Sequence, residues 1–133
     1  MLEPELQSNL PKSEKLTRKE LAQLGEEHAC KHVASLGYRI VKRNFRLGKV
    51  GEIDIVAYDG DTLVFVEVKT RVDYSYGPPE ASVDPRKQAQ LKRVARGYYY
   101  VNAIQEAVCR FDVIAVELMG KSVELRHHKN AFI

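Results

Sequence analysis

The spacing of apolar and polar residues predicts two helices and five strands. Residues 17–36 place apolar side chains on one face at helical spacing, and a capping box formed by Thr17 and Glu20 marks where this helix begins. A second helix is predicted over 85–103, with Asp84 as its N-cap and a proline directly after it. Strand patterns occupy residues 38–45, 52–58, 61–70, 110–118 and 122–127. The order αβββαββ predicts the α/β class, with a mixed β-sheet flanked by helices.

The second and third strands form a hairpin whose charged residues gather at one end. Asp59-Gly60 is a typical two-residue turn, and it predicts that Asp54 faces Phe65 and that Glu52 faces Glu67. One face of the hairpin is then wholly apolar and belongs to the core; it consists of Ile53, Ile55, Ala57, Val64, Val66 and Val68. The other face begins apolar beside the turn and ends in Glu52, Asp54, Glu67 and Lys69.

Carboxylates placed so close together repel one another, so a positive group is expected between them. Lys69 is one candidate, and a divalent cation is the other, since paired carboxylates and water are a common way of holding Mg²⁺. The alternative is an exposed strand face crossed by salt bridges. Two roles are open for Glu52: it takes part in the surroundings of the metal, or it forms an ion pair with a nearby basic residue.

Length and composition indicate an ordinary globular protein. With 133 residues, 44% of them hydrophobic and 29% charged, the chain suits one domain, which we place at 17–133 behind a flexible arm at 1–16. The two cysteines show no CxxC spacing, which argues against a disulfide framework or a zinc ribbon. No apolar stretch is long enough to span a membrane, so we expect a cytoplasmic protein without a membrane anchor.

Basic residues cluster where a nucleic acid would meet the charged end of the hairpin, although the net charge is only +3. The second helix carries Arg86, Lys92, Arg93 and Arg96 on one arc, while Lys87 falls in the apolar stripe and is expected to approach the acidic cluster. Lys42, Arg43, Arg46 and Lys49 flank the loop that leads to Glu52. The alternative is a solvated helix face.

Two further patterns favour packing over chemistry. Tyr98-Tyr99-Tyr100 allows base stacking, but Tyr98 lies in the core stripe, so packing with partial exposure is favoured. His28 and His32 share one helix side without suitably spaced further ligands, which favours ordinary packing over zinc binding.

Asp54 followed by Glu67-Val68-Lys69 on the next strand resembles the active-site signature of the PD-(D/E)xK, or restriction-endonuclease-like, nucleases. The likeness extends over about residues 20–133. It includes Gly25-Glu26-x-x-Ala29, Arg43-Asn44-x-Arg46, Gly51-Glu52-Ile53-Asp54, Val64 to Arg71 and Arg110-Phe111-Asp112-Val113. In combination these motifs resemble the YraN family, which is related in fold to archaeal Holliday-junction resolvases. Ile53 replaces the proline that the superfamily signature places before its first aspartate.

The resemblance implies a restriction-endonuclease-like core and metal-dependent cleavage of DNA. By this resemblance, Asp54 and Glu67 would ligate Mg²⁺ or Mn²⁺ together with the Val68 carbonyl. Lys69 would orient the attacking water or help to deprotonate it. Glu26 matches the acidic residue that the superfamily often supplies from its first helix. We therefore expect a DNA endonuclease of repair or recombination, acting on branched or single-stranded DNA; the alternative is a non-catalytic nucleic-acid-binding protein. A homodimer would suit a two-stranded substrate. The expected DNA-contacting residues are Arg43, Arg46, Lys49, Arg71, Arg86, Lys87, Lys92, Arg93 and Arg96.

Overall fold

The computed structural model describes residues 16–73 and 77–133, so the arm predicted at 1–16 lies almost wholly outside the described residues. Within them the predicted order αβββαββ is confirmed, with one short 3₁₀ helix added. The elements are α2 (Arg18–Ser35), β1 (Arg39–Leu47), β2 (Gly51–Asp59), β3 (Thr62–Arg71), η2 (Pro79–Ser82), α3 (Pro85–Val101), β4 (Cys109–Met119) and β5 (Ser122–Phe132).

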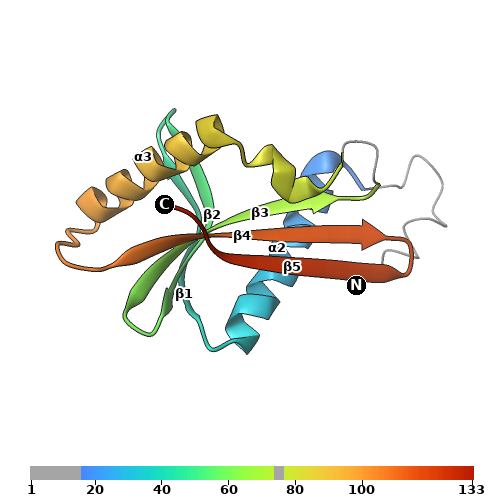
Figure 1. Cartoon of the computed structure of the whole chain (residues 1–133), viewed down its shortest axis with the longest axis horizontal. Coiled ribbons are helices and arrows are strands. Elements are labelled where there is room, and N and C mark those ends of the chain that lie inside the picture. Colours follow the sequence, from blue (N-terminus) through green and yellow to red (C-terminus); the bar gives the residue numbers. More distant parts are fainter. Residues whose placement is uncertain (1–15, 74–76) are drawn as a thin grey trace.

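The five strands form one mixed sheet in the order β1-β2-β3-β4-β5 (Figure 1). Neighbouring strands are antiparallel except β3 and β4, which run parallel. A parallel pair needs a crossover, and the chain makes it through η2 and α3. The molecule is therefore an α/β protein with a mixed sheet and two α-helices in its described part, as the sequence predicts.

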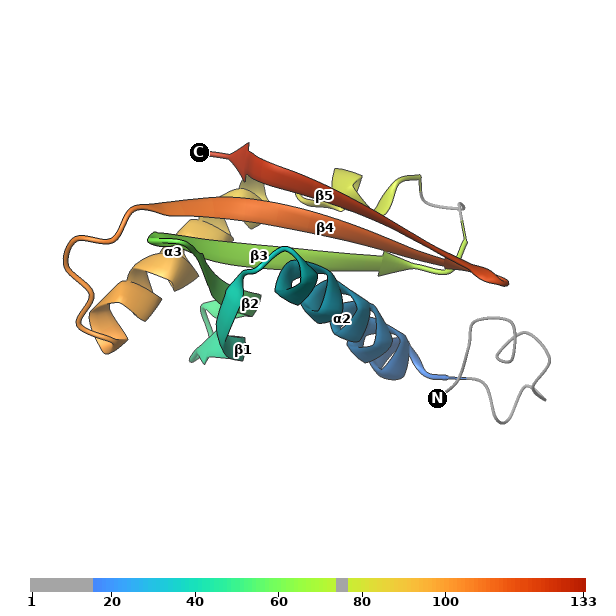
Figure 2. The same ribbon diagram turned by 90° about the horizontal axis from the view of Figure 1, so that it is seen from below.

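The two helices cover opposite faces of the sheet and create two apolar cores (Figure 2). The core under α3 contains Val56, Leu63, Phe65, Leu91, Val94 and Tyr98. The core under α2 contains Ala29, Val33, Ile55, Val64, Val66 and Ile114. Glycines let both helices approach closely: a Cβ at Gly25 would overlap Thr70 Oγ1 on β3, and one at Gly97 would overlap the Leu47 side chain on β1.

The predicted register of the β2–β3 hairpin is wrong by two residues. Asp59 pairs with Thr62 and Val56 with Phe65, so the two turn residues are Gly60 and Asp61. Gly60 has a φ of 60°, which suits this turn type. The observed register carries Asp54, and not Glu52, to the position opposite Glu67.

The strands also change face where the site lies, contrary to the single apolar face expected for the hairpin. Ile55 packs in the core under α2, whereas Ile53, two residues earlier, packs in the core under α3. On β1, Asn44 has a φ of 54°, which turns the chain out of regular strand geometry. Asn44 stands opposite Asp54 in the β1–β2 register, where Arg43 pairs with Ile55 and Phe45 with Ile53. The sheet is therefore irregular at Asp54.

A buried polar network fixes the end of α2 on the sheet. The His32 Nε2 atom lies 3.0 Å from His127 Nδ1, and His127 Nε2 lies 2.7 Å from Asp112 Oδ2. Arg110 Nε donates to the other oxygen of Asp112, which is fully buried. His32 is thus part of a hydrogen-bonded network with His127 and Asp112.

Candidate active site

Asp54 and Glu67 meet where β2 and β3 separate. The pairing between these strands ends at Ile55–Val66, and one step further the same register sets Asp54 opposite Glu67. The Val68 N–H donates to Asp54 Oδ2 over 2.8 Å. The Asp54 side chain thus satisfies a backbone donor at the opening of the hairpin, and this bond fixes the carboxylate beside Glu67.

Burial and mutual repulsion distinguish these two carboxyl groups from surface acids. Glu67 is only 5% exposed. Burial raises the pKa of Asp54 well above its usual range, and the negative charge of Glu67 raises this pKa further, while the bond from Val68 N–H opposes the shift. Burial and the neighbouring negative charge thus disfavour the ionised form of Asp54.

Two lysines from different elements supply positive charge to Glu67. Lys69 Nζ lies 3.6 Å from Glu67 Oε2, and Lys87 Nζ lies 3.3 Å from the same oxygen. Lys69 follows Glu67 by two residues on β3, whereas Lys87 comes from the first turn of α3, where its N–H donates to the N-cap side chain of Asp84. The sequence prediction that Lys87 approaches the acidic cluster is confirmed.

Glu26 on α2 is the third acid near this point. Burial raises the pKa of Glu26 and the charges of Glu52 and Glu67 add to the effect, while Arg43 opposes it. Glu26 and Lys69 both line a groove of about 710 Å³ between the start of α2 and the end of β3. The groove is therefore open to solvent beside Glu26 and Lys69.

Glu52 lies at the border of the site. Its carboxylate Oε2 is 3.8 Å from Arg46 Nη1, and both side chains are more than a third exposed. Of the two roles that the sequence left open, the structure thus shows an ion pair with a nearby basic residue. At this distance and exposure the pair adds little stability.

The predicted DNA-contacting residues lie in different surroundings. Arg43 and Arg46 are engaged in ion pairs, since Arg43 Nη1 lies 2.7 Å from Glu27 Oε1 and Arg46 pairs with Glu52. Four further residues are exposed: Lys49, Arg86, Arg93 and Arg96. Arg71 lines the groove beside Glu26, and Lys87 contacts Glu67. The Lys92 Nζ atom lies 5.9 Å from the centre of the Phe132 ring. The exposed group and Arg71 remain the members best placed to meet a phosphate.

The donor set fits a hard divalent cation held by few protein ligands. No cluster of three or more His, Cys, Asp or Glu side chains close enough to hold a metal ion occurs among the described residues. Asp54 and Glu67 offer two carboxylates, and Mg²⁺ is commonly held by one or two carboxylates with water and substrate phosphates. The repulsion that raises the pKa of Asp54 is the condition that a bound cation would relieve.

Comparison with known proteins gives the family. Residues 25–116, which include Glu26, Asp54, Glu67, Lys69 and Lys87, match the model described as "Uncharacterised protein family UPF0102". The chain belongs to this family. This is the family known as YraN, so the membership that the sequence motifs indicated is confirmed.

UPF0102 proteins of several bacteria resemble this chain over most of its length. The Desulforamulus reducens protein is 43% identical over 120 residues, covering 87% of this chain and 98% of that protein. The Moorella thermoacetica protein is 46% identical over 103 residues, covering 77% and 85%. The Geotalea uraniireducens protein is 45% identical over 115 residues, covering 86% and 90%. In the described part of this UPF0102 protein, no helix is long and apolar enough to cross a membrane.

Proposed function

We propose that this protein is a metal-dependent endonuclease that hydrolyses phosphodiester bonds in branched or single-stranded DNA. The supporting observation is the pair Asp54 and Glu67 at the opening between β2 and β3, with two lysines on Glu67. The order αβββαββ and the mixed sheet are consistent with a restriction-endonuclease-like core. We place its role in DNA repair or recombination.

In this proposal, Asp54, Glu67 and the Val68 carbonyl hold Mg²⁺ or Mn²⁺. When bound, such a cation lowers the pKa of a coordinated water and neutralises charge on the scissile phosphate. The Val68 N–H keeps Asp54 Oδ2 in place, so the ligands are oriented before the cation arrives.

Lys69 and Lys87 hold positive charge next to the reacting phosphate. Because Glu67 is nearly buried, their ammonium groups are desolvated in part and act more strongly than surface lysines. Lys69 would orient the attacking water or help to deprotonate it. The raised pKa of Glu26, across the groove from Lys69, suits a carboxyl that exchanges a proton with solvent.

DNA would bind through its backbone. Arg86, Arg93 and Arg96 are exposed along α3, whose first turn carries Lys87 into the site. A duplex or single strand lying along this helix would release counterions, so binding would weaken steeply with salt. Recognition would depend on DNA shape and not on base sequence.

The test is a cleavage assay on the full chain after removal of metal with EDTA. A panel of fluorescent Holliday-junction, flap, single-stranded and duplex DNAs is incubated with and without Mn²⁺. We expect Mn²⁺-dependent cuts in the branched or single-stranded substrates and a loss of at least about 100-fold with Glu67→Gln. Glu124→Gln, an exposed glutamate on β5, is the matched control and should cut normally.

Two outcomes would reject the proposal. If Glu67→Gln cuts as fast as the wild type, the site is assigned to the wrong residues. If the wild type binds these DNAs but cuts none of them with Mn²⁺ or Mg²⁺, the protein is the non-catalytic binding protein that the sequence left as the alternative.

A further inference from the structure

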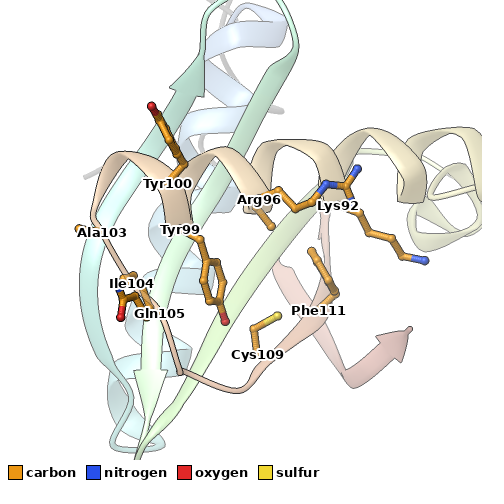
Figure 3. Close-up of a pocket in the computed structure, with 10 residues that line it drawn as sticks. Lys92, Arg96, Tyr99, Tyr100, Ala103, Ile104, Gln105, Cys109 and Phe111 are labelled. Carbon is orange, nitrogen blue, oxygen red and sulfur yellow. The ribbon is translucent and has the colours of Figure 1, made fainter.

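A second groove lies at the opposite end of α3 from the carboxylate site. It has a volume of about 800 Å³, within the range of small-molecule sites, and it runs between the last turns of α3 and the segment that enters β4 (Figure 3). The proposed function leaves this groove unused.

Two aromatic side chains that are already fixed in place form its wall. The Tyr99 hydroxyl donates to the Ala107 carbonyl over 2.7 Å, which fixes the ring. Phe111 is stacked with Phe65 and Phe132, with ring centres 5.6 and 4.9 Å apart. In Figure 3 the Tyr99 ring points down toward Cys109. The half-buried Tyr99 ring is thus held in place as the aromatic surface for a planar guest, while Phe111 is buried and stacked with both Phe65 and Phe132.

The rim of the groove favours an anion. Lys92 and Arg96 lie on the α3 side, and none of the described residues that line the groove is acidic. A planar apolar interior with a cationic rim suits a nucleobase whose own phosphate lies on the rim, because aromatic side chains stack on bases and arginine pairs with phosphate.

The groove lies within reach of the same DNA strand. Arg86, Arg93 and Arg96 are exposed along α3, and Arg96 also lines the groove. From Lys87 in the site to Tyr99 in the groove the helix rises over twelve residues, which is about 18 Å. At the rise of one strand of B-DNA this corresponds to about five nucleotides.

We propose that the groove takes an unpaired nucleobase of the bound DNA, about five nucleotides from the cut. This inference rests on the proposed function and narrows its substrate class. A base that is paired inside a duplex cannot enter the groove without leaving the stack, whereas a base in a single strand or at a branch point can. The protein therefore prefers DNA with unpaired nucleotides on one side of the scissile phosphate.

The test uses Cys109, which lines the groove, in a Cys30→Ala background. The rate of Cys109 alkylation by N-ethylmaleimide is measured in EDTA, so the assay needs no cleavage. Three DNAs are compared: a single-stranded 20-mer, the same sequence as a duplex, and a 20-mer whose sugars are all abasic. We expect the single strand to slow alkylation at least tenfold at saturation, and the duplex and the abasic strand to leave the rate within twofold.

A charge placed in the groove gives an independent readout. Gln105→Glu adds a carboxylate to the lining, and Gln23→Glu adds the same charge at an exposed position of α2, which covers the other face of the sheet. Gln105→Glu should weaken single-strand binding in fluorescence anisotropy about tenfold, whereas Gln23→Glu should change it less than twofold. Circular dichroism of both variants checks that they fold.

Three results would overturn the inference: equal protection of Cys109 by the abasic strand, equal losses for both glutamate variants, or protection that rises with protein concentration in the absence of DNA. The last would assign the groove to contact between two copies. These measurements need no cleavage, so they separate the two proposals. Protection of Cys109 without DNA cleavage would reject the proposed nuclease activity and keep the proposed base-binding groove. Cleavage without protection would keep the nuclease activity and reject the base-binding groove.

Discussion

Lys87→Met tests whether α3 contributes a charge to the site or only packs on it. Lys87 Nζ lies 3.3 Å from Glu67 Oε2 and Lys69 Nζ lies 3.6 Å from it. At an effective dielectric constant of about 20 each attraction is about 5 kcal/mol before desolvation. Removing the only partner of a buried charge costs about 3–5 kcal/mol, but Lys69 stays. We therefore expect Lys87→Met to lower the free energy of unfolding by about 1–3 kcal/mol.

The assay is urea unfolding of four metal-free proteins: the wild type, Lys87→Met, Glu67→Gln and the double variant. If the ion pair is responsible, Lys87→Met costs less than about 0.5 kcal/mol once Glu67 is already neutral. Lys31→Met, an exposed lysine of α2, controls for the loss of charge. The same cost for Lys87→Met in both backgrounds would refute the reasoning, since packing alone would then explain it.

Three further predictions concern an ion pair between η2 and β5, the contact of α2 with β3, and Asp54. Hydrogen bonds from Arg126 lower the pKa of Glu80 to about 2. The ionised Glu80 therefore stabilises the fold above pH 4.5, and this stabilisation is lost as the pH falls toward 2. Glu80→Gln should remove about 1–2 kcal/mol of this acid-sensitive stability, as measured by urea unfolding at several pH values. Gly25→Ala should cost about 1–3 kcal/mol, because its Cβ would overlap Thr70 Oγ1, and Thr70→Gly should recover part of this loss in thermal unfolding. Asp54→Asn should stabilise the metal-free protein by about 1 kcal/mol, since it removes one of two adjacent carboxylates, and should abolish stabilisation by Mg²⁺ in calorimetry.

Local sequence signals were enough to place the helices and the order of the strands, although β5 runs to Phe132, beyond the predicted 122–127. The capping box of Thr17 and Glu20 forms as predicted, and the Asp84 side chain accepts the Lys87 N–H at the start of α3. These signals act within one helical turn, so no tertiary information is needed. The buried face of α3 also follows from its spacing, as the burial of Leu91, Val94, Ala95 and Tyr98 shows.

The hairpin register could not be read from the sequence, because Asp59-Gly60 and Gly60-Asp61 are both acceptable two-residue turns. The choice between them moves the partner of Glu67 by two residues, from Glu52 to Asp54. The change of face at Asp54 was equally hidden, since no sequence pattern marks that Ile53 and Ile55 pack in different cores.

Long-range partners were predictable only where a pattern was broken. Lys87 interrupts an apolar stripe, and this anomaly correctly pointed to the acidic cluster. Arg43 interrupts no such pattern, and the sequence could not show that Glu27 on α2 holds its guanidinium. Glu52 and Arg46, both on adjacent strands, likewise meet through a pairing that only the sheet reveals.

The central claim is that one cation held by Asp54 and Glu67 is required for cleavage. The most direct measurement is a Mn²⁺ titration in which electron paramagnetic resonance follows free Mn²⁺ while gel electrophoresis follows the cut strand of a fluorescent branched DNA. We predict that occupancy and cleavage rise with the same midpoint and that Glu67→Gln loses both. Undiminished cleavage by Glu67→Gln, or cleavage by the wild type at full rate before any Mn²⁺ is bound, would contradict this account.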